Sequence, residues 1–82
     1  MAIAAQYRTQ DGRNSAHATY AGQMIEVVTG YDINEDRYPF HVYVTKGGVR
    51  YKVDCKSAFE SNKDAALDAG LGFAAHWIDA NP

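Results

Sequence analysis

The sequence has little of what small proteins use to cross-link a fold or to enter a membrane. Its 82 residues include one cysteine, Cys55, so no disulfide can form within the chain, and no Asn-x-Ser/Thr glycosylation acceptor is present. Both absences are typical of a reducing compartment, so we expect a cytoplasmic protein. No apolar run approaches the roughly 20 residues that cross a bilayer, and residues 1–6 lack the features of a signal peptide. We expect a small soluble protein without a membrane partner.

An excess of charge of one sign is also missing. Ten acidic residues against eight basic residues give a net charge of −2. No general basic field would therefore collect nucleic acid or anionic lipid. With 46% hydrophobic and 22% charged residues, the composition excludes a disordered chain, a collagen-like repeat and a coiled coil. The length gives room for one hydrophobic core.

The first part of the chain has few large apolar residues. Over residues 1–19 only Ile3 and Tyr7 are large and apolar, and the remainder is mostly Gln, Arg, Asn, Ser, Thr and Ala. Such a composition is typical of a weakly structured segment. The sequence therefore predicts a flexible N-terminal tail over residues 1–19 and a single domain over residues 20–82.

What the chain does have is a clear strand pattern in its middle. Residues 24–29 are rich in β-branched side chains and predict a strand, and the polar residues 30–39 predict a loop. Gly47 and Gly48 separate two alternating runs, which is the pattern of a hairpin with a two-residue loop. Counting outward from these glycines places Val42 opposite Val53, Val44 opposite Tyr51 and Phe40 opposite Cys55 on one face. Thr45 then lies opposite Arg50, Tyr43 opposite Lys52 and His41 opposite Asp54 on the other face.

Beyond residue 56 the apolar period changes to that of a helix. Ser61 is the predicted N-cap, with Asp64 three residues later completing a capping pattern. Leu67, Leu71 and Ile78 lie on the apolar stripe of a helix over residues 62–78. Gly70 and Gly72 interrupt this helix, and we expect them to allow a close approach to the sheet. The predicted fold is α+β: a three-stranded antiparallel β-meander with one C-terminal helix packed on one face.

The order of these core and turn residues resembles a group of short uncharacterised bacterial proteins. The matching pattern is Tyr20-x-Gly22-x-x-Ile25-x-Val27, an aromatic-led strand from Phe40, Phe59-x-Ser61, and an Ala-rich helix ending Trp77-Ile78-Asp79. The resemblance implies a three-stranded meander followed by one helix, and a bacterial or phage origin. It implies no catalytic or binding residue, because the function of that group is unknown.

The residue types that carry chemistry are scattered. His17, His41, Cys55 and His76 lack the spacing that places metal ligands on one face. Cys55, predicted to lie opposite Phe40, fits a small core residue better than a nucleophile. Gly70-Leu71-Gly72 lacks the third glycine and the preceding strand of a dinucleotide-binding loop. We therefore expect no enzyme, no metal, no cofactor and no small-molecule ligand.

The sheet face opposite the predicted helix is the remaining candidate site. The residues proposed to bind there are Met24, Val28, His41, Tyr43, Arg50 and Lys52. One interpretation is purely structural, since polar cross-strand pairs stabilise an open sheet face. The functional interpretation is that Met24, Val28 and Tyr43 form an apolar strip rimmed by charge, where another protein docks.

Two further binding modes remain open at the sequence level. An exposed edge strand could pair with another protein or with a second copy of the chain. Residues 24–29 are the expected edge unless the N-terminal segment adds a strand there. The alternative function is weak binding of single-stranded nucleic acid through Tyr43, Arg50 and Lys52. The net charge and the acidic residues Glu26 and Asp54 argue against that alternative.

Overall fold

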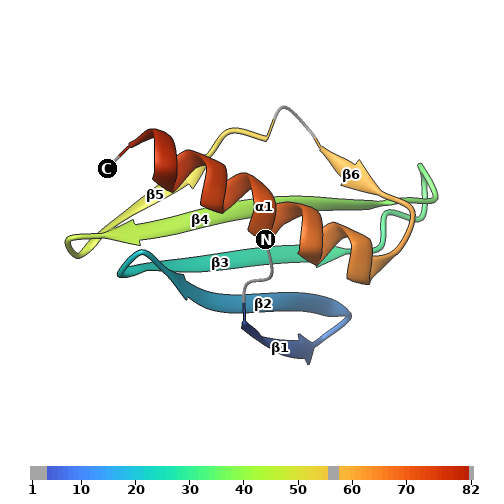
Figure 1. Cartoon of the computed structure of the whole chain (residues 1–82). Helices are drawn as coiled ribbons and strands as arrows, with labels where there is room; N and C mark the ends of the chain where they lie inside the picture. The colour runs from blue at the N-terminus through green and yellow to red at the C-terminus, as the bar shows by residue number, and fades with distance from the viewer. Residues whose placement is uncertain (1–3, 56–57, 82) are drawn as a thin grey trace.

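The computed structural model describes residues 4–55 and 58–81, which form one antiparallel sheet and one C-terminal helix. Five strands follow one another across the sheet in chain order: β1 (Ala5–Gln10), β2 (Arg13–Tyr20), β3 (Gln23–Gly30), β4 (Tyr38–Lys46) and β5 (Val49–Val53). The short β6 (Phe59–Glu60) pairs with the start of β4. Helix α1 (Lys63–Ala80) lies across one face of the sheet (Figure 1).

The α+β class with an antiparallel sheet and one C-terminal helix is confirmed, but the predicted number of three strands is wrong. The prediction of a flexible tail is also wrong for residues 4–19, because β1 and β2 extend the sheet through this segment. Its small side chains are the physical reason. Ala16 is completely buried beneath the helix layer, where a larger side chain would separate helix and sheet. Residues 1–3 of the predicted tail lie outside the described residues.

Three hairpins of the same kind join β1 to β2, β2 to β3 and β4 to β5. Each loop has two consecutive residues with positive φ: Asp11–Gly12 (52° and 76°), Ala21–Gly22 (51° and 78°) and Gly47–Gly48 (58° and 79°). Two positive φ angles define the type I′ turn, whose twist matches that of the flanking strands. Gly47–Gly48 therefore forms the predicted loop, and Asp11–Gly12 and Ala21–Gly22 form two further loops of the same turn type.

The register predicted for the β4–β5 hairpin is confirmed over the length of its ladder. Val42 pairs with Val53, Tyr43 with Lys52, Val44 with Tyr51, and Thr45 with Arg50. The predicted pairs Phe40–Cys55 and His41–Asp54 are absent, since the ladder ends at Val42–Val53. The backbone N–H of Phe40 instead donates to the carbonyl oxygen of Ala58 at 3.3 Å.

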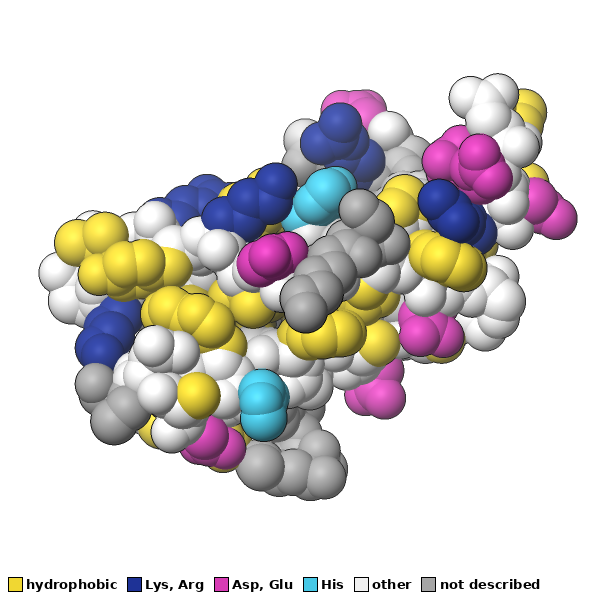
Figure 2. Space-filling view, turned by 90° about the horizontal axis from the view of Figure 1, so that it is seen from above, with side chains coloured by type: hydrophobic (Ala, Val, Ile, Leu, Met, Phe, Trp, Pro, Cys, Tyr) yellow, Lys and Arg dark blue, Asp and Glu magenta, His cyan; other side chains and the backbone are white. Residues whose placement is uncertain are grey.

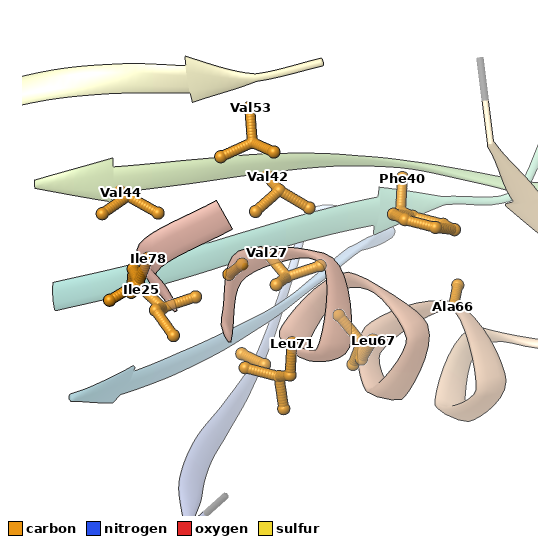
Figure 3. Close-up of a cluster of buried hydrophobic side chains, with 12 residues drawn as sticks. Ile25, Val27, Phe40, Val42, Val44, Val53, Ala66, Leu67, Leu71 and Ile78 are labelled. Carbon is orange, nitrogen blue, oxygen red and sulfur yellow. The ribbon is translucent and has the colours of Figure 1, made fainter. Parts of the chain in front are cut away.

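The core lies between α1 and the inner face of the sheet. Figure 3 shows Val27 of β3 and Val42 and Val44 of β4 facing α1. These valines and Leu67, Leu71 and Ile78 of α1 are almost completely buried. Thr29 and its ladder partner Asn14 are buried polar residues at the end of this layer, and the Thr29 hydroxyl donates to the carbonyl oxygen of Pro39 at 2.8 Å.

The helix begins one residue later than predicted. Asn62 is the N-cap, and its side-chain Oδ1 accepts a hydrogen bond from the N–H of Ala65 at 2.8 Å. Ser61, the predicted N-cap, precedes it. Either side chain can accept this bond, and the path of the chain from β6 decides which one is in position.

The strand expected to be an edge is internal, because the N-terminal segment adds strands beside it, the alternative that the prediction left open. β3, which includes residues 24–29, is paired with β2 on one side and β4 on the other. Pairing with another chain through this strand is therefore excluded. The edges of the five-stranded path are β1 and β5.

Candidate binding surface

The face of the sheet opposite α1 has no covering layer in the described part of the chain. Ile25, Val27 and Thr29 point toward the helix, so the alternate residues of β3 point away from it. The register carries this alternation to the neighbouring strands. This open face includes Arg8, Arg13, Ser15, His17, Met24, Glu26, Val28, His41, Tyr43, Arg50 and Lys52.

The centre of the open face is a small polar network. Nη2 of Arg50 lies 2.6 Å from Oε1 of Glu26, and Nε2 of His17 lies 3.8 Å from the other carboxylate oxygen. The guanidinium of Arg50 also lies 4.1 Å from the centroid of the Tyr43 ring. Arg50 thus forms an ion pair with Glu26, and its guanidinium covers one side of the Tyr43 ring.

A shallow groove of about 720 Å³ runs along the open face beside the loop that follows β3. Val28, His41, Tyr43 and Lys52 line it together with Arg13. Arg13 and Val28 also line a second hollow of about 460 Å³, whose walls include Arg8 and His17. The two hollows share these two residues. Basic side chains line both, together with Asp32 in the first hollow and with Asp11 and Glu26 in the second.

The groove brings together four of the six residues predicted to bind: Val28, His41, Tyr43 and Lys52. Arg50 lies over Tyr43, outside the lining. Met24 is 64% exposed but lies apart, because Glu26 stands between Met24 and Val28 on the same face of β3. The predicted apolar strip of Met24, Val28 and Tyr43 is therefore not continuous.

The prediction missed Arg8, Arg13 and the loop residue Tyr31, which lie on β1, at the start of β2 and after β3. The sequence does contain a signal that would place Arg8 and Arg13 in strands. Asp-Gly at positions 11 and 12 is a strong hairpin dipeptide, and the residues on both sides of it alternate. Once the hairpin is recognised, Arg8 and Arg13 fall on the open face.

Within the described ranges β5 pairs with β4 alone, so its other edge is free there. This edge borders an apolar strip on the helix side of the sheet, formed by Val49 (51% exposed), Tyr51 (41%), Phe73 (42%) and the partly buried Trp77. The Tyr51 and Trp77 rings pack with their centroids 5.6 Å apart. Figure 2, which views the molecule from above relative to Figure 1, shows hydrophobic side chains gathered beside Lys and Arg side chains. The edge therefore separates an apolar surface from a basic one.

Cys55 is partly buried at the edge of the core. Its Sγ lies 3.6 Å from the carbonyl oxygen of Val53. Burial, and then the nearby carboxylate of Asp54, raise the pKa of the Cys55 thiol above its usual value. A raised pKa is the opposite of what an activated nucleophile needs.

The histidines do not converge with the other residues that could bind a metal. Within residues 4–55 and 58–81, no group of three or more His, Cys, Asp or Glu side chains is arranged to hold a metal ion. His76 is exposed on α1, while His17 and His41 lie on the open face. No helix in the described part of the chain is long and apolar enough to span a membrane.

Comparison with known proteins gives no family from which a function could be transferred. No family model matches the sequence, and no curated protein or solved structure is significantly similar to the chain. The candidate site therefore depends on the geometry and charge of the molecule itself.

Proposed function

We propose that this protein is a non-enzymatic binding module that engages an acidic segment of another protein through the open face of its sheet. The observation that supports this proposal is the distribution of charge over the two faces. Over its strands, the open face has Arg8, Arg13, Arg50 and Lys52 against Glu26 alone. Asp11, Asp32 and Asp54 lie in the loops at its border. The strands of this face are therefore locally basic, although the chain has a small negative net charge.

The opposite side of the molecule has the complementary charge. Asp64, Asp68 and Asp79 are exposed on α1, whose one lysine or arginine is Lys63. Lys46 of β4 also reaches this side, where its Nζ donates to the carbonyl oxygen of Asn81 at 3.0 Å. An acidic ligand is attracted to the sheet side and repelled from the helix side, which orients it during approach. A second copy that docks open face against open face would bring like charges together, so a different protein is the favoured partner.

Single-stranded nucleic acid is the second candidate, because Tyr43, Lys52 and Arg13 line one groove. Base stacking needs an accessible aromatic face. Arg50 occupies one face of Tyr43 through its position 4.1 Å from the ring centroid, and it is itself held by Glu26. Base stacking on this side of the ring would have to displace Arg50, whereas an acidic peptide needs no aromatic face, so the contact favours a protein partner.

The proposal is tested by titrating isotopically labelled protein with poly-L-glutamate and following the backbone amide signals. We expect shifts over β2 to β5 that weaken as salt is added. Arg13→Glu should weaken binding about fivefold or more, since it replaces attraction by repulsion. Lys63→Glu on the exposed side of α1 is the matched control and should leave binding unchanged.

Two outcomes would overturn the proposal. One is that Arg13→Glu and Lys63→Glu weaken binding equally, which would mean that poly-L-glutamate does not select the open face. The other is that a mixed-sequence single-stranded oligonucleotide binds this face more tightly than poly-L-glutamate, which would favour the nucleic-acid function.

A further inference from the structure

We infer that the acidic partner adds to the sheet as a strand along the free edge of β5, and that its sequence alternates acidic and apolar residues. This inference rests on the proposed function and names the mode and chemistry of binding. It follows from three properties of β5: its unpaired backbone edge, the different chemistry of its two faces, and its unsuitability for pairing with itself.

The backbone of β5 presents hydrogen-bonding groups away from the sheet. Among the described residues β5 pairs with β4 alone. Lys46 and Val49 close a two-residue hairpin, so they form a hydrogen-bonded pair. Non-hydrogen-bonded and hydrogen-bonded pairs then alternate along the ladder, so Arg50 and Lys52 belong to non-hydrogen-bonded pairs. Arg50 and Lys52 therefore occupy the positions whose N–H and C=O groups point outward from the edge. An extended segment can bond to these groups without disturbing the β4–β5 ladder.

The two faces beside this edge would select different side chains on an added strand. On the helix side, its residues would lie next to Val49 and Tyr51, where Trp77 extends the apolar surface. On the open face, its residues would lie next to Arg50 and Lys52. Because successive side chains of a strand point to opposite faces, the complementary sequence alternates apolar and acidic residues.

The same charges disfavour a second copy at this edge. Antiparallel pairing of two β5 strands about Tyr51 would place Arg50 of each copy opposite Lys52 of the other. Like charges directly opposite one another destabilise a strand pair. Basic side chains on an edge thus oppose self-association while they accept an acidic strand.

The other edge lacks this pair of surfaces. β1 alternates Gln6, Arg8 and Gln10 on the open face with Ala5, Tyr7 and Thr9 on the helix side. Tyr7 is the single large apolar residue there, whereas β5 has Val49 and Tyr51 next to Trp77. The observations therefore favour β5 for binding of a strand with apolar residues.

The test uses a blocked peptide that alternates glutamate and valine over about seven residues, enough to span the five residues of β5. The protein variants are Lys52→Pro and its matched control Lys52→Gln. Both remove the charge, but only Lys52→Pro removes an outward N–H, and proline is tolerated on the free side of an edge strand. We expect Lys52→Pro to bind the peptide about tenfold more weakly than Lys52→Gln.

A second measurement leaves the protein unchanged. Two versions of the peptide are N-methylated on alternate residues, one on the glutamates and the other on the valines. Only one edge of the peptide pairs with β5, so one version should keep its affinity and the other should lose it by about tenfold or more. A peptide that alternates lysine and valine should not bind.

The outcomes separate this inference from the proposed function. Equal binding to Lys52→Pro and Lys52→Gln, together with equal binding of both methylated peptides, would overturn strand addition. If Arg13→Glu still abolished binding of poly-L-glutamate in that case, the proposed function would stand without the edge. If the alternating peptide binds as expected while poly-L-glutamate does not bind to the open face, the open face is not the binding surface, and strand addition at the β5 edge is still supported.

Discussion

Gly70 of α1 lies directly against Val27 of β3. A Cβ atom placed on Gly70 would overlap Cγ1 of Val27 and crowd its other methyl group. Val27 is completely buried in the centre of the sheet, so it has no free space into which it can move. The absence of a side chain at Gly70 therefore sets how closely the helix approaches the sheet. Gly72, two residues along, has open space around it.

Substituting these two glycines by alanine should change stability in opposite directions. Gly70→Ala should lower the free energy of unfolding by about 1–3 kcal/mol, because the added methyl group forces the helix and sheet apart. Gly72→Ala should raise it by about 0.5–1 kcal/mol, because alanine has the higher helix propensity and meets no neighbour. Urea denaturation of both variants measures the difference. An unchanged midpoint for Gly70→Ala would show that the contact with Val27 does not fix the layer spacing.

Ala21 is a position where the native residue is not the most stable one. Its φ of 51° is in the left-handed region, which an alanine adopts at a cost in energy. Ala21→Asn should raise the free energy of unfolding by about 0.5–1 kcal/mol, because Asn-Gly is a preferred type I′ pair. Thermal denaturation of the wild type and Ala21→Asn measures this difference in stability. Asp11→Asn at the equivalent loop position is the control and should change little, since aspartate already tolerates this conformation.

Tyr20 connects the sheet to the end of the helix, and this contact predicts a pH dependence. Its hydroxyl donates to the carboxylate of Asp79, with distances of 3.0 Å and 3.1 Å to the two oxygens. This hydrogen bond, reinforced by the negative charge of Asp79, raises the pKa of Tyr20 above its usual value of 10.0. The stabilisation is therefore present below pH 10.0 and is lost as the pH rises through the higher pKa of the folded state.

The prediction is checked by comparing wild type with Tyr20→Phe in urea denaturation on both sides of pH 10.0. The stability advantage of the wild type should shrink as the pH rises, because the phenylalanine variant has no group to ionise. In Asp79→Asn, carbon NMR of the tyrosine rings should show the Tyr20 pKa returning toward its usual value. A Tyr20 pKa that is the same in wild type and Asp79→Asn would contradict the assigned cause.

The environment of Cys55 predicts slow alkylation. Burial raises the pKa of its thiol, so a smaller fraction is thiolate at neutral pH than in an exposed cysteine. The rate of Cys55 alkylation by iodoacetamide should be lower in the native protein than in the unfolded protein. As the pH is raised, this rate should begin to increase at a higher pH than the alkylation rate of a free thiol does. Asp54→Asn should shift this profile to lower pH by removing the second cause. Rapid labelling of the native protein at neutral pH would contradict a partly buried thiol.

The open face shows where sequence reasoning succeeded and where it did not. The positions of His41, Tyr43, Arg50 and Lys52 on one face follow from local pairing across Gly47–Gly48, and the register bears this out. The contribution of Arg8 and Arg13 did not emerge, because a run of small and polar residues was interpreted as a tail. Such residues form strands here because their backbones pair in register with β3 through β2, and because small side chains such as the completely buried Ala16 fit between sheet and helix.

The sequence by itself determined the β4–β5 register, the helical stripe of α1 and the alternation that separates buried from open residues. These depend on spacing along the chain, which local sterics and side-chain period dictate. Only the tertiary structure decided that β3 is internal and that Asn62 caps the helix. It also decided that β5, in the part of the chain that the structure describes, is an edge strand with one apolar and one basic side. Each of these depends on which segment comes to lie beside another, and that is the outcome of competition among all the surfaces the chain can bury.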